Sequence, residues 1–200
     1  MMNIAVFASH NGSDLQAIID ACQSGVLDAS VCAVFSNNGS SMALERARNA
    51  GIASYHASVK IYGDDDTLND KVLELLEQHN TDIVFLAGYL KKMGNKVLRK
   101  YQNRIFNIHP ALLPKYGGEG MYGIHVHQAV IDAHEKESGI TIHRASENYD
   151  EGEIVAQTIV PVSDADTAES LAAKILEREH TFIVETLKKI VAGEISTEKP

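Results

Sequence analysis

Ile83-Val84-Phe85-Leu86-Ala87 is an uninterrupted apolar run that Gly88 brings to an end. A short run of this kind, without polar alternation, is typical of a strand buried on both faces in the middle of a parallel sheet. Such a strand needs helices on both sides, and helix-like and strand-like segments alternate before and after it. The run therefore predicts an α/β protein.

The order of the surrounding elements predicts a Rossmann-like open sheet with helices on both faces. Its N-terminal part is expected to be parallel and its C-terminal edge mixed and antiparallel, because the last two strand-like segments lie close enough to pair across a turn that holds Asp150. We expect strands at residues 3–8, 30–36, 52–56, 82–88, 104–109, 140–146 and 154–160, and helices at residues 13–24, 41–50, 68–76, 95–101, 126–133 and 167–192, the last with a capping box at Thr167 and Ser170.

Composition limits the possible partners. The chain has 200 residues, 44% of them apolar, and no proline-, serine- or charge-rich stretch divides it, so we expect one domain over residues 1–200. The formal net charge of -9 disfavours nucleic acid as a partner, because binding backbone phosphates requires clustered Lys and Arg. No apolar run is long enough to predict a membrane span, and the apolar start at residues 1–8 predicts a buried strand rather than a signal peptide.

Cysteine and histidine spacing gives no sign of a metal site. Cys22 and Cys32 fall in an expected helix and an expected strand without a spacing motif. They are typical of small core residues in a reducing compartment, which predicts a cytoplasmic protein. His125 and His127 lie two residues apart but have no third ligand nearby, so we expect packing or lid roles and no metal.

Asn107 and His109 close the strand that precedes a long, glycine-rich loop. Residues two apart in a strand point to the same face, and Pro110 favours the end of the strand there. Open α/β sheets bind ligands at the carboxyl ends of their strands. Together with Asp150, this amide and imidazole could stabilise an oxyanion, move a proton and orient the ring. The simpler alternative is a hydrogen-bonded strand edge with a solvated acid.

The loop between the first strand and the first helix is a second candidate site. The N–H groups of Gly12, Ser13 and Asp14 would converge at the helix N-terminus, where they could bind an anion. The alternative is a capping box formed by Ser13 and Gln16, which needs no ligand.

The stretch Phe106-Asn107-Ile108-His109-Pro110-Ala111-Leu112-Leu113-Pro114 resembles the signature of the folate-dependent formyltransferases, and the likeness continues through Lys115-Tyr116-Gly117. The resemblance covers nearly the whole chain and points to the single-domain member that acts in purine synthesis. Further matches, in the family's order and at roughly its spacing, lie at residues 9–19, 34–37, 86–88, 149–152 and 179–180.

The resemblance implies transfer of a formyl group from 10-formyltetrahydrofolate to the amine of 5'-phosphoribosylglycinamide by a monomer or homodimer, without a metal. It divides the domain into a phosphate-binding half, residues 1–100, and a catalytic and folate-binding half, residues 101–200. Without the resemblance, Glu179 would be taken for a charge on a solvated helix face. The implied residues are Asn107, His109 and Asp150 for catalysis, Gly12, Ser13 and Asp14 for the phosphate, Glu179 for the ribose, and Leu90, Lys91, Lys92, Met93, Asn107, Glu147, Asn148, Tyr149 and Asp150 for the folate.

Formyl transfer to an amine passes through a tetrahedral species that is anionic at oxygen and cationic at nitrogen. We expect Asn107 and protonated His109 to donate to the oxyanion, and Asp150 to raise the pKa of His109 and to order a water for proton transfer. Two alternatives stay open: a 10-formyltetrahydrofolate hydrolase and a non-catalytic ligand-binding module on the same fold. The hydrolase is expected to carry an added N-terminal domain, whereas the first strand here starts at Asn3.

Four features depart from the family. His10 and Asp14 stand where the family more often has Gly and Asn, and a carboxylate repels a phosphate dianion unless it turns away. The acidic run Asp64-Asp65-Asp66 replaces a basic residue near the folate tail. The loop at 117–123, with four glycines in seven positions, is longer than the family's usual connection and is expected to be mobile and to close over substrates.

Overall fold

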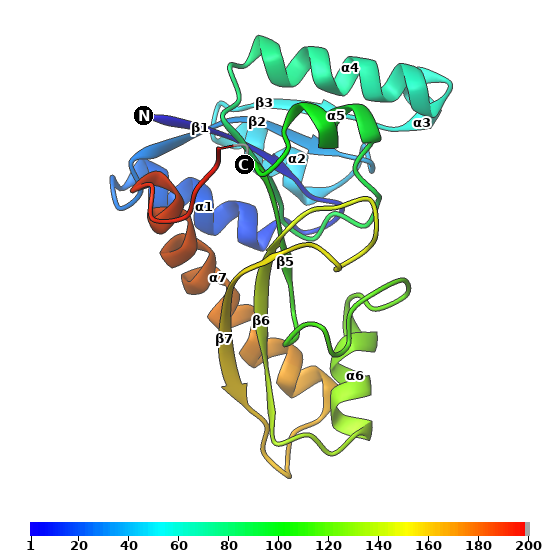
Figure 1. The fold of residues 1–200 in the computed structure, drawn as a ribbon, viewed down its shortest axis with the longest axis vertical. Helices are drawn as coiled ribbons and strands as arrows, with labels where there is room; N and C mark the ends of the chain where they lie inside the picture. Colours follow the sequence, from blue (N-terminus) through cyan, green and yellow to red (C-terminus); the bar gives the residue numbers. More distant parts are fainter. Residues whose placement is uncertain (199–200) are drawn as a thin grey trace.

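The computed structural model describes residues 1–198, which fold around one seven-stranded sheet (Figure 1). The strand order across the sheet is β3-β2-β1-β4-β5-β6-β7. Within the described residues no helix combines the length and the apolar content that crossing a bilayer requires. The strands are β1 (Met2–Phe7), β2 (Ala29–Ser36), β3 (Ala53–His56), β4 (Ile83–Leu86), β5 (Ile105–His109), β6 (Glu137–Arg144) and β7 (Ile154–Pro161), and the helices are α1 (Ser13–Gln23), α2 (Met42–Asn49), α3 (Val59–Tyr62), α4 (Asp65–Gln78), α5 (Asn95–Lys100), α6 (Ile124–Asp132) and α7 (Ala168–Val191).

The sheet changes from parallel to antiparallel pairing at β5. Strands β1 to β5 pair in parallel, whereas β6 pairs antiparallel with both β5 and β7. The predicted fold class, including the antiparallel C-terminal edge, is therefore confirmed. The register places Asn107 beside Leu86 of β4 on one side and beside His143 of β6 on the other.

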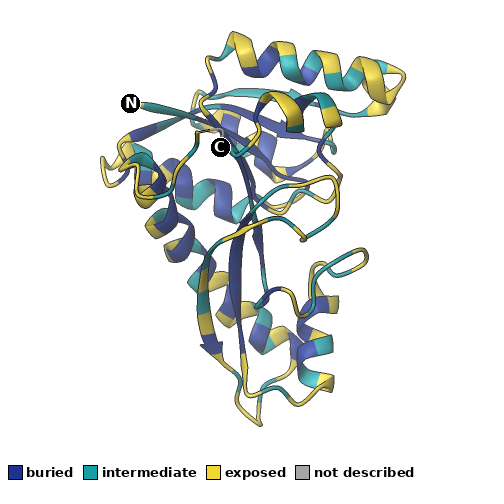
Figure 2. Cartoon of the chain, in the orientation of Figure 1, coloured by how far each residue is buried: buried dark blue, intermediate teal, exposed yellow. Residues whose placement is uncertain are grey.

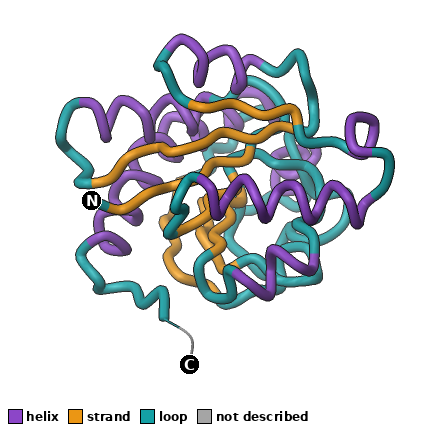
Figure 3. The backbone as a smooth tube through the Cα atoms, turned by 90° about the horizontal axis from the view of Figure 1, so that it is seen from above, coloured by secondary structure: helices purple, strands orange, loops and turns teal. Residues whose placement is uncertain are grey.

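Two apolar cores lie on the two faces of the sheet. Ile4 and Val6 of β1 pack on the side of α1 and α7, while Ala5 and Phe7 pack on the side of α4 and α5. The view from above shows helices on both sides of the strands (Figure 3), and the central strands are dark with burial while the outer helix faces are exposed (Figure 2). Because helices cover both faces of the sheet, every residue of β4 is buried.

Most predicted elements form, with shifted ends. Helix α6 begins at Ile124, before the expected start, and the short helix α3 was not predicted. The capping box at the start of α7 is confirmed, because Thr167 and Ser170 each accept from the other's backbone N–H.

The alternative of a capping box at the start of α1 is wrong, because Gly12 rather than Ser13 is the N-cap. Gly12 has a left-handed backbone with φ 69°, and no side chain caps the helix. The side chain of Gln16 instead donates to Asp20 and accepts from Arg46. The first N–H groups of α1 are therefore left without the side-chain acceptor that would compete with a ligand.

Gly12 also lies so close to α2 that no larger residue fits. A Cβ atom there would be 2.8 Å from the Cβ and 2.9 Å from the Cα of Ala43. We expect Gly12→Ala to lower the free energy of unfolding by about 2–4 kcal/mol, the sum of left-handed strain and overpacking. Gly25→Ala is the matched control, since Gly25 shares the positive φ but has open space around it, and about 1 kcal/mol is expected. Urea unfolding measures both, and equal losses would contradict the packing argument.

Candidate functional site

A cavity of about 540 Å³ opens at the carboxyl ends of β4 and β5. This size is typical of small-molecule sites, and the position is the one that open α/β sheets use for ligands. The loop before α6 and the loop between β6 and β7 form its walls, and α7 contributes its N-terminal half. The lining includes Asp14, Leu90, Lys91, Lys92, Met93, Asn107, His109, Gly118, Tyr122, His127, His143, Asn148, Tyr149, Asp150, Leu176 and Glu179.

The three predicted catalytic residues converge on this cavity. Asn107 and His109 lie two apart on β5, and Asp150 reaches them from the loop after β6. The Asp150 carboxylate lies 3.5 Å from His109 Nδ1 through Oδ2, and 3.4 Å from Asn107 Nδ2 through Oδ1. The structure thus brings together an amide, an imidazole and a carboxylate from distant parts of the chain, while their catalytic roles stay a prediction.

A fourth polar side chain, His143 on β6, joins this group and was missed by the sequence analysis. Its Nε2 lies 2.9 Å from Asn107 Nδ2 and 3.4 Å from Asp150 Oδ1. Its Nδ1 lies 2.9 Å from the carbonyl oxygen of Arg144, which can only accept, so Nδ1 carries a proton. Thr141 and His143 are buried and alternate with Ile140 and Ile142 along β6, a polar pattern that could have marked this face.

The backbone around Asp150 is shaped to hold its carboxylate inside. Asp150 itself has φ 57°, and a Cβ atom on Gly152 would lie 1.7 Å from the Arg144 carbonyl oxygen. The Gly118 N–H donates to Asp150 Oδ2 over 3.0 Å. Burial by itself would raise the pKa of Asp150, but its contacts with His143, His109 and the Gly118 amide outweigh burial and hold that pKa below the usual value.

The expected protonated state of His109 is wrong for this arrangement. Burial lowers the pKa of His109 by more than the neighbouring Asp150 raises it, so the ring is neutral at physiological pH. Its Nε2 lies 2.8 Å from the carbonyl oxygen of Tyr116, which fixes the proton of the neutral ring on Nε2. His109 Nδ1 therefore has no proton to give to Asp150.

Residues 118–123 of the loop at 117–123 contribute to the lining of the cavity. The start of the loop is anchored to Glu135, which accepts from Lys115 Nζ at 2.7 Å and from the Tyr116 hydroxyl at 2.9 Å. The predicted mobility of the loop stays a prediction.

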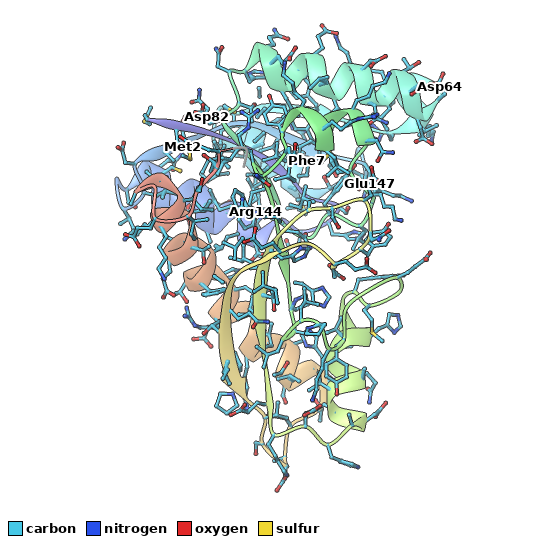
Figure 4. The ribbon with its side chains drawn as sticks, in the orientation of Figure 1. Met2, Phe7, Asp64, Asp82, Arg144 and Glu147 are labelled. Atoms are coloured by element: carbon cyan, nitrogen blue, oxygen red, sulfur yellow. The ribbon has the colours of Figure 1, made fainter. Side chains whose placement is uncertain are left out.

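Most of the predicted folate residues line the cavity, and one does not. Lys92 Nζ lies 4.9 Å from the centre of the Tyr149 ring, which closes one wall through a cation–π contact. Glu147 is exposed on the loop between β6 and β7 and is absent from the lining, and Figure 4 labels it there and Asp64 at the start of α4.

The phosphate end of the cavity contains two buried acids. Asp14 and Glu179 line the cavity and are 9% and 8% exposed, so the alternative of a solvated charge at Glu179 is wrong. Gly12 and Ser13 stand beside them at the N-terminus of α1 without lining the cavity. Burial raises the pKa of Asp14 to about 6, against a lowering by His180, and burial with the nearby Asp14 raises the pKa of Glu179 well above its usual value.

Arg46 of α2 holds the loop that precedes α1, a role that the sequence analysis missed. Its Nε donates to the Asn11 carbonyl at 2.8 Å, and Nη2 donates to Asn11 Oδ1 at 3.2 Å. Its Nη1 donates to Gln16 Oε1 at 3.1 Å. One guanidinium thus joins the loop to the first turns of α1 and fixes the position of the helix N-terminus.

Among residues 1–198, no three His, Cys, Asp or Glu side chains are placed to hold a metal ion. His125 is exposed and stacks edge-on against Tyr122, whereas His127 is buried and lines the cavity.

The fold and this cavity define an α/β protein that binds a small molecule at the carboxyl ends of its parallel strands. The sequence pattern of the family described as "Formyl transferase" matches residues 2–187. The chain belongs to the formyl transferase family.

Similarity to known formyltransferases extends over most of this chain. The chain is 39% identical over 197 residues to the chloroplastic phosphoribosylglycinamide formyltransferase of Vigna unguiculata, covering 98% of this chain and 63% of the relative. It is 35% identical to phosphoribosylglycinamide formyltransferase of Escherichia coli strain K12, covering 90% and 83%. The solved structure of glycinamide ribonucleotide transformylase 1 from Symbiobacterium toebii superposes with a TM-score of 0.89 at 34% identity, covering 96% and 89%. The chain thus spans less than two thirds of the plant relative's length.

The raised pKa of Asp14 makes a prediction about stability. A carboxyl group with a pKa near 6 when folded and about 4 when unfolded destabilises the fold once it is ionised, so the cost appears as the pH rises from 4 to 6 and is complete above it. We expect Asp14→Asn to raise the free energy of unfolding by about 1–3 kcal/mol at pH 8 and to have no effect below pH 4. Urea unfolding across this range measures it, with exposed Asp28→Asn as the control. A loss of stability at pH 8 would contradict the assignment.

Proposed function

We propose that the chain transfers the formyl group of 10-formyltetrahydrofolate to the primary amine of 5'-phosphoribosylglycinamide, a step of purine synthesis. The observation that carries the proposal is the single cavity that joins Asn107, His109 and Asp150 to the N-terminus of α1. A reaction between two ligands needs one space that holds both, with reactive groups where they meet. Membership of the formyl transferase family and the names of the relatives support the same substrates.

The two ends of the cavity suit the two proposed substrates. We assign the phosphate to the backbone N–H groups of Gly12, Ser13 and Asp14, since a helix N-terminus without a side-chain cap favours an anion. Glu179 is the proposed acceptor for the ribose hydroxyls. The folate is assigned to residues 90–93, Asn107 and residues 147–150, although Glu147 would have to turn inward to reach it.

In the proposed reaction the amine attacks the formyl carbon, which forms a C–N bond and places negative charge on the formyl oxygen. Asn107 Nδ2 has two N–H groups, and the 2.9 Å bond to His143 uses one. The other makes only a 3.4 Å contact with Asp150, and we assign it to the oxyanion. The His109 Nε2–H, which now donates to the Tyr116 carbonyl, is the second proposed donor once the formyl oxygen replaces that carbonyl.

Collapse of the intermediate breaks the bond between the formyl carbon and N10 of the folate. The attacking amine loses one proton and N10 gains one, so a proton must cross the site. The neutral ring of His109 has its lone pair on Nδ1, 3.5 Å from Asp150 Oδ2, and can take up the proton there through a water while the carboxylate stabilises the imidazolium; the imidazolium then returns a proton to N10 as the bond to the formyl carbon breaks.

The broader features of the proposal follow the sequence expectations. We propose a phosphate-binding half at residues 1–100, a catalytic and folate-binding half at residues 101–200, a monomeric or homodimeric state and a cytoplasmic location. Both cysteines are free thiols, which is consistent with a reducing compartment.

The deciding assay follows the absorbance of 10-formyltetrahydrofolate with and without 5'-phosphoribosylglycinamide. The proposal expects loss of the formyl group only when the amine is present. Loss in water alone would identify a hydrolase, and no loss in either case would leave only a ligand-binding module.

The catalytic set makes a prediction about turnover. We expect His109→Asn and Asp150→Asn each to lower kcat by about 10²- to 10³-fold, because each removes a group that stabilises the transition state. His134→Asn is the control, since His134 is exposed and its φ of 51° suits Asn. Steady-state kinetics with unchanged thermal unfolding measures the effect, and a kcat within threefold of the parent would remove the residue from the mechanism.

The three hydrogen bonds from Arg46 to Asn11 and Gln16 predict an effect on substrate binding without an effect on the chemical step. Arg46→Met removes three hydrogen bonds to Asn11 and Gln16, so the helix N-terminus loses its fixed position. We expect KM for 5'-phosphoribosylglycinamide to rise about tenfold or more, with little change in kcat or in KM for the folate. Exposed Arg48→Met on the same helix removes the same charge and should leave all three constants unchanged. A fall in kcat alone would contradict this positioning role of Arg46.

A further inference from the structure

A carboxyl oxygen without a hydrogen-bond partner is buried at the start of α1. Asp14 Oδ1 is inaccessible to solvent and neither accepts nor donates a hydrogen bond within the described part of the chain. The residue is 9% exposed and lines the same cavity as the catalytic set. Buried polar atoms are almost always paired in folded proteins, so this unpaired oxygen belongs to a carboxyl group that the protein leaves unsatisfied at the edge of the cavity.

The groups that face Asp14 come from α7. His180 Nε2, also buried and unpaired, lies 3.7 Å from Asp14 Oδ1, which is too long for a hydrogen bond. Glu179 is a second buried carboxyl group, and it lies close enough to Asp14 for the charge of Asp14 to raise the pKa of Glu179. From α2, the guanidinium of Arg46 is bonded to Asn11 and Gln16. Within residues 1–198, the charged or titratable side chains that interact with Asp14 are therefore one acid, Glu179, and one imidazole, His180.

A phosphate bound at the N-terminus of α1 would lie next to the Asp14 carboxyl group. Helix α1 has 11 residues and no side-chain cap, so its first N–H groups are available to an anion. A phosphate dianion and an ionised Asp14 would repel each other in a buried site, where water screens charge poorly. A protonated Asp14 removes the repulsion, and its O–H group can donate to a phosphate oxygen.

We propose that Asp14 binds the phosphate-bearing substrate in its acid form, so that binding takes up one proton from solvent and weakens as the pH rises. This inference rests on the proposed function and adds a specificity-determining residue to it. The sign follows from linkage: where the complex holds one more proton than the free partners, the dissociation constant increases about tenfold per pH unit. The raised pKa of Asp14, about 6 in the free protein, agrees with a proton that is easily recruited near neutral pH.

The test is calorimetric titration of the full chain with 5'-phosphoribosylglycinamide, without folate, between pH 6.5 and pH 8.5. Buffers with different ionisation enthalpies report the number of protons taken up. We expect the parent protein to take up about one proton at pH 8, and its dissociation constant to rise about tenfold per pH unit. Asp14→Asn should take up almost none and bind at least about tenfold more tightly than the parent at pH 8, since it keeps the shape and removes the charge.

Two further variants decide which group carries the proton. Asp28→Asn removes one exposed charge after α1 and should behave like the parent. Proton uptake that persists in Asp14→Asn, or that disappears in His180→Gln instead, would overturn the inference and assign the proton to the phosphate or to His180. Loss of binding in Asp14→Asn would also overturn it. Absence of binding by the parent at every pH would instead overturn the proposed function.

Discussion

The burial of the Asp150 carboxylate is the constraint on which the site depends. An isolated buried charge costs several kcal/mol, so donors from separate segments must reach it: Asn107 from β5 and the Gly118 N–H from the loop before α6. The close approach of Gly152 to Arg144 and the left-handed backbone of Asp150 serve the same end. Even the change to antiparallel pairing at β5 matters here, because it sets His143 beside Asn107.

Local physical rules in the sequence predicted the sheet and part of the site. Continuous apolar runs identify central parallel strands, and the two-residue period of a strand places Asn107 and His109 on one face. Neither rule says where a distant turn will lie, so the convergence of Asp150 was available only from the family resemblance. His143 was missed because the alternation of Thr141 and His143 marks a face of the strand but does not say which residues lie across the sheet from it.

The expectations that were wrong share a cause. In each case two local effects oppose each other, and only the contacts and burial of the folded chain decide which is stronger. Ser13 and Gln16 fit a capping box, but contact with Ala43 demands glycine at position 12, and Arg46 and Asp20 engage Gln16 instead. Protonated His109 was a fair expectation from Asp150 alone, yet the sign of the pKa shift depends on how much water the folded loop removes. Burial is a property of the whole fold and is the quantity that sequence patterns predict least well at single positions.

The Tyr116 carbonyl accepts a hydrogen bond from His109, and the Gly118 amide donates one to Asp150. The protein's own backbone thus satisfies both side chains. An entering molecule that offers atoms of the same polarity exchanges one set of hydrogen bonds for another at little net cost. A hydrocarbon of the same shape would strand buried donors and acceptors at about 1–3 kcal/mol each. Under the proposed function, mimics that match the contour of the substrates but lack their carbonyl and amine groups are therefore expected to bind more weakly.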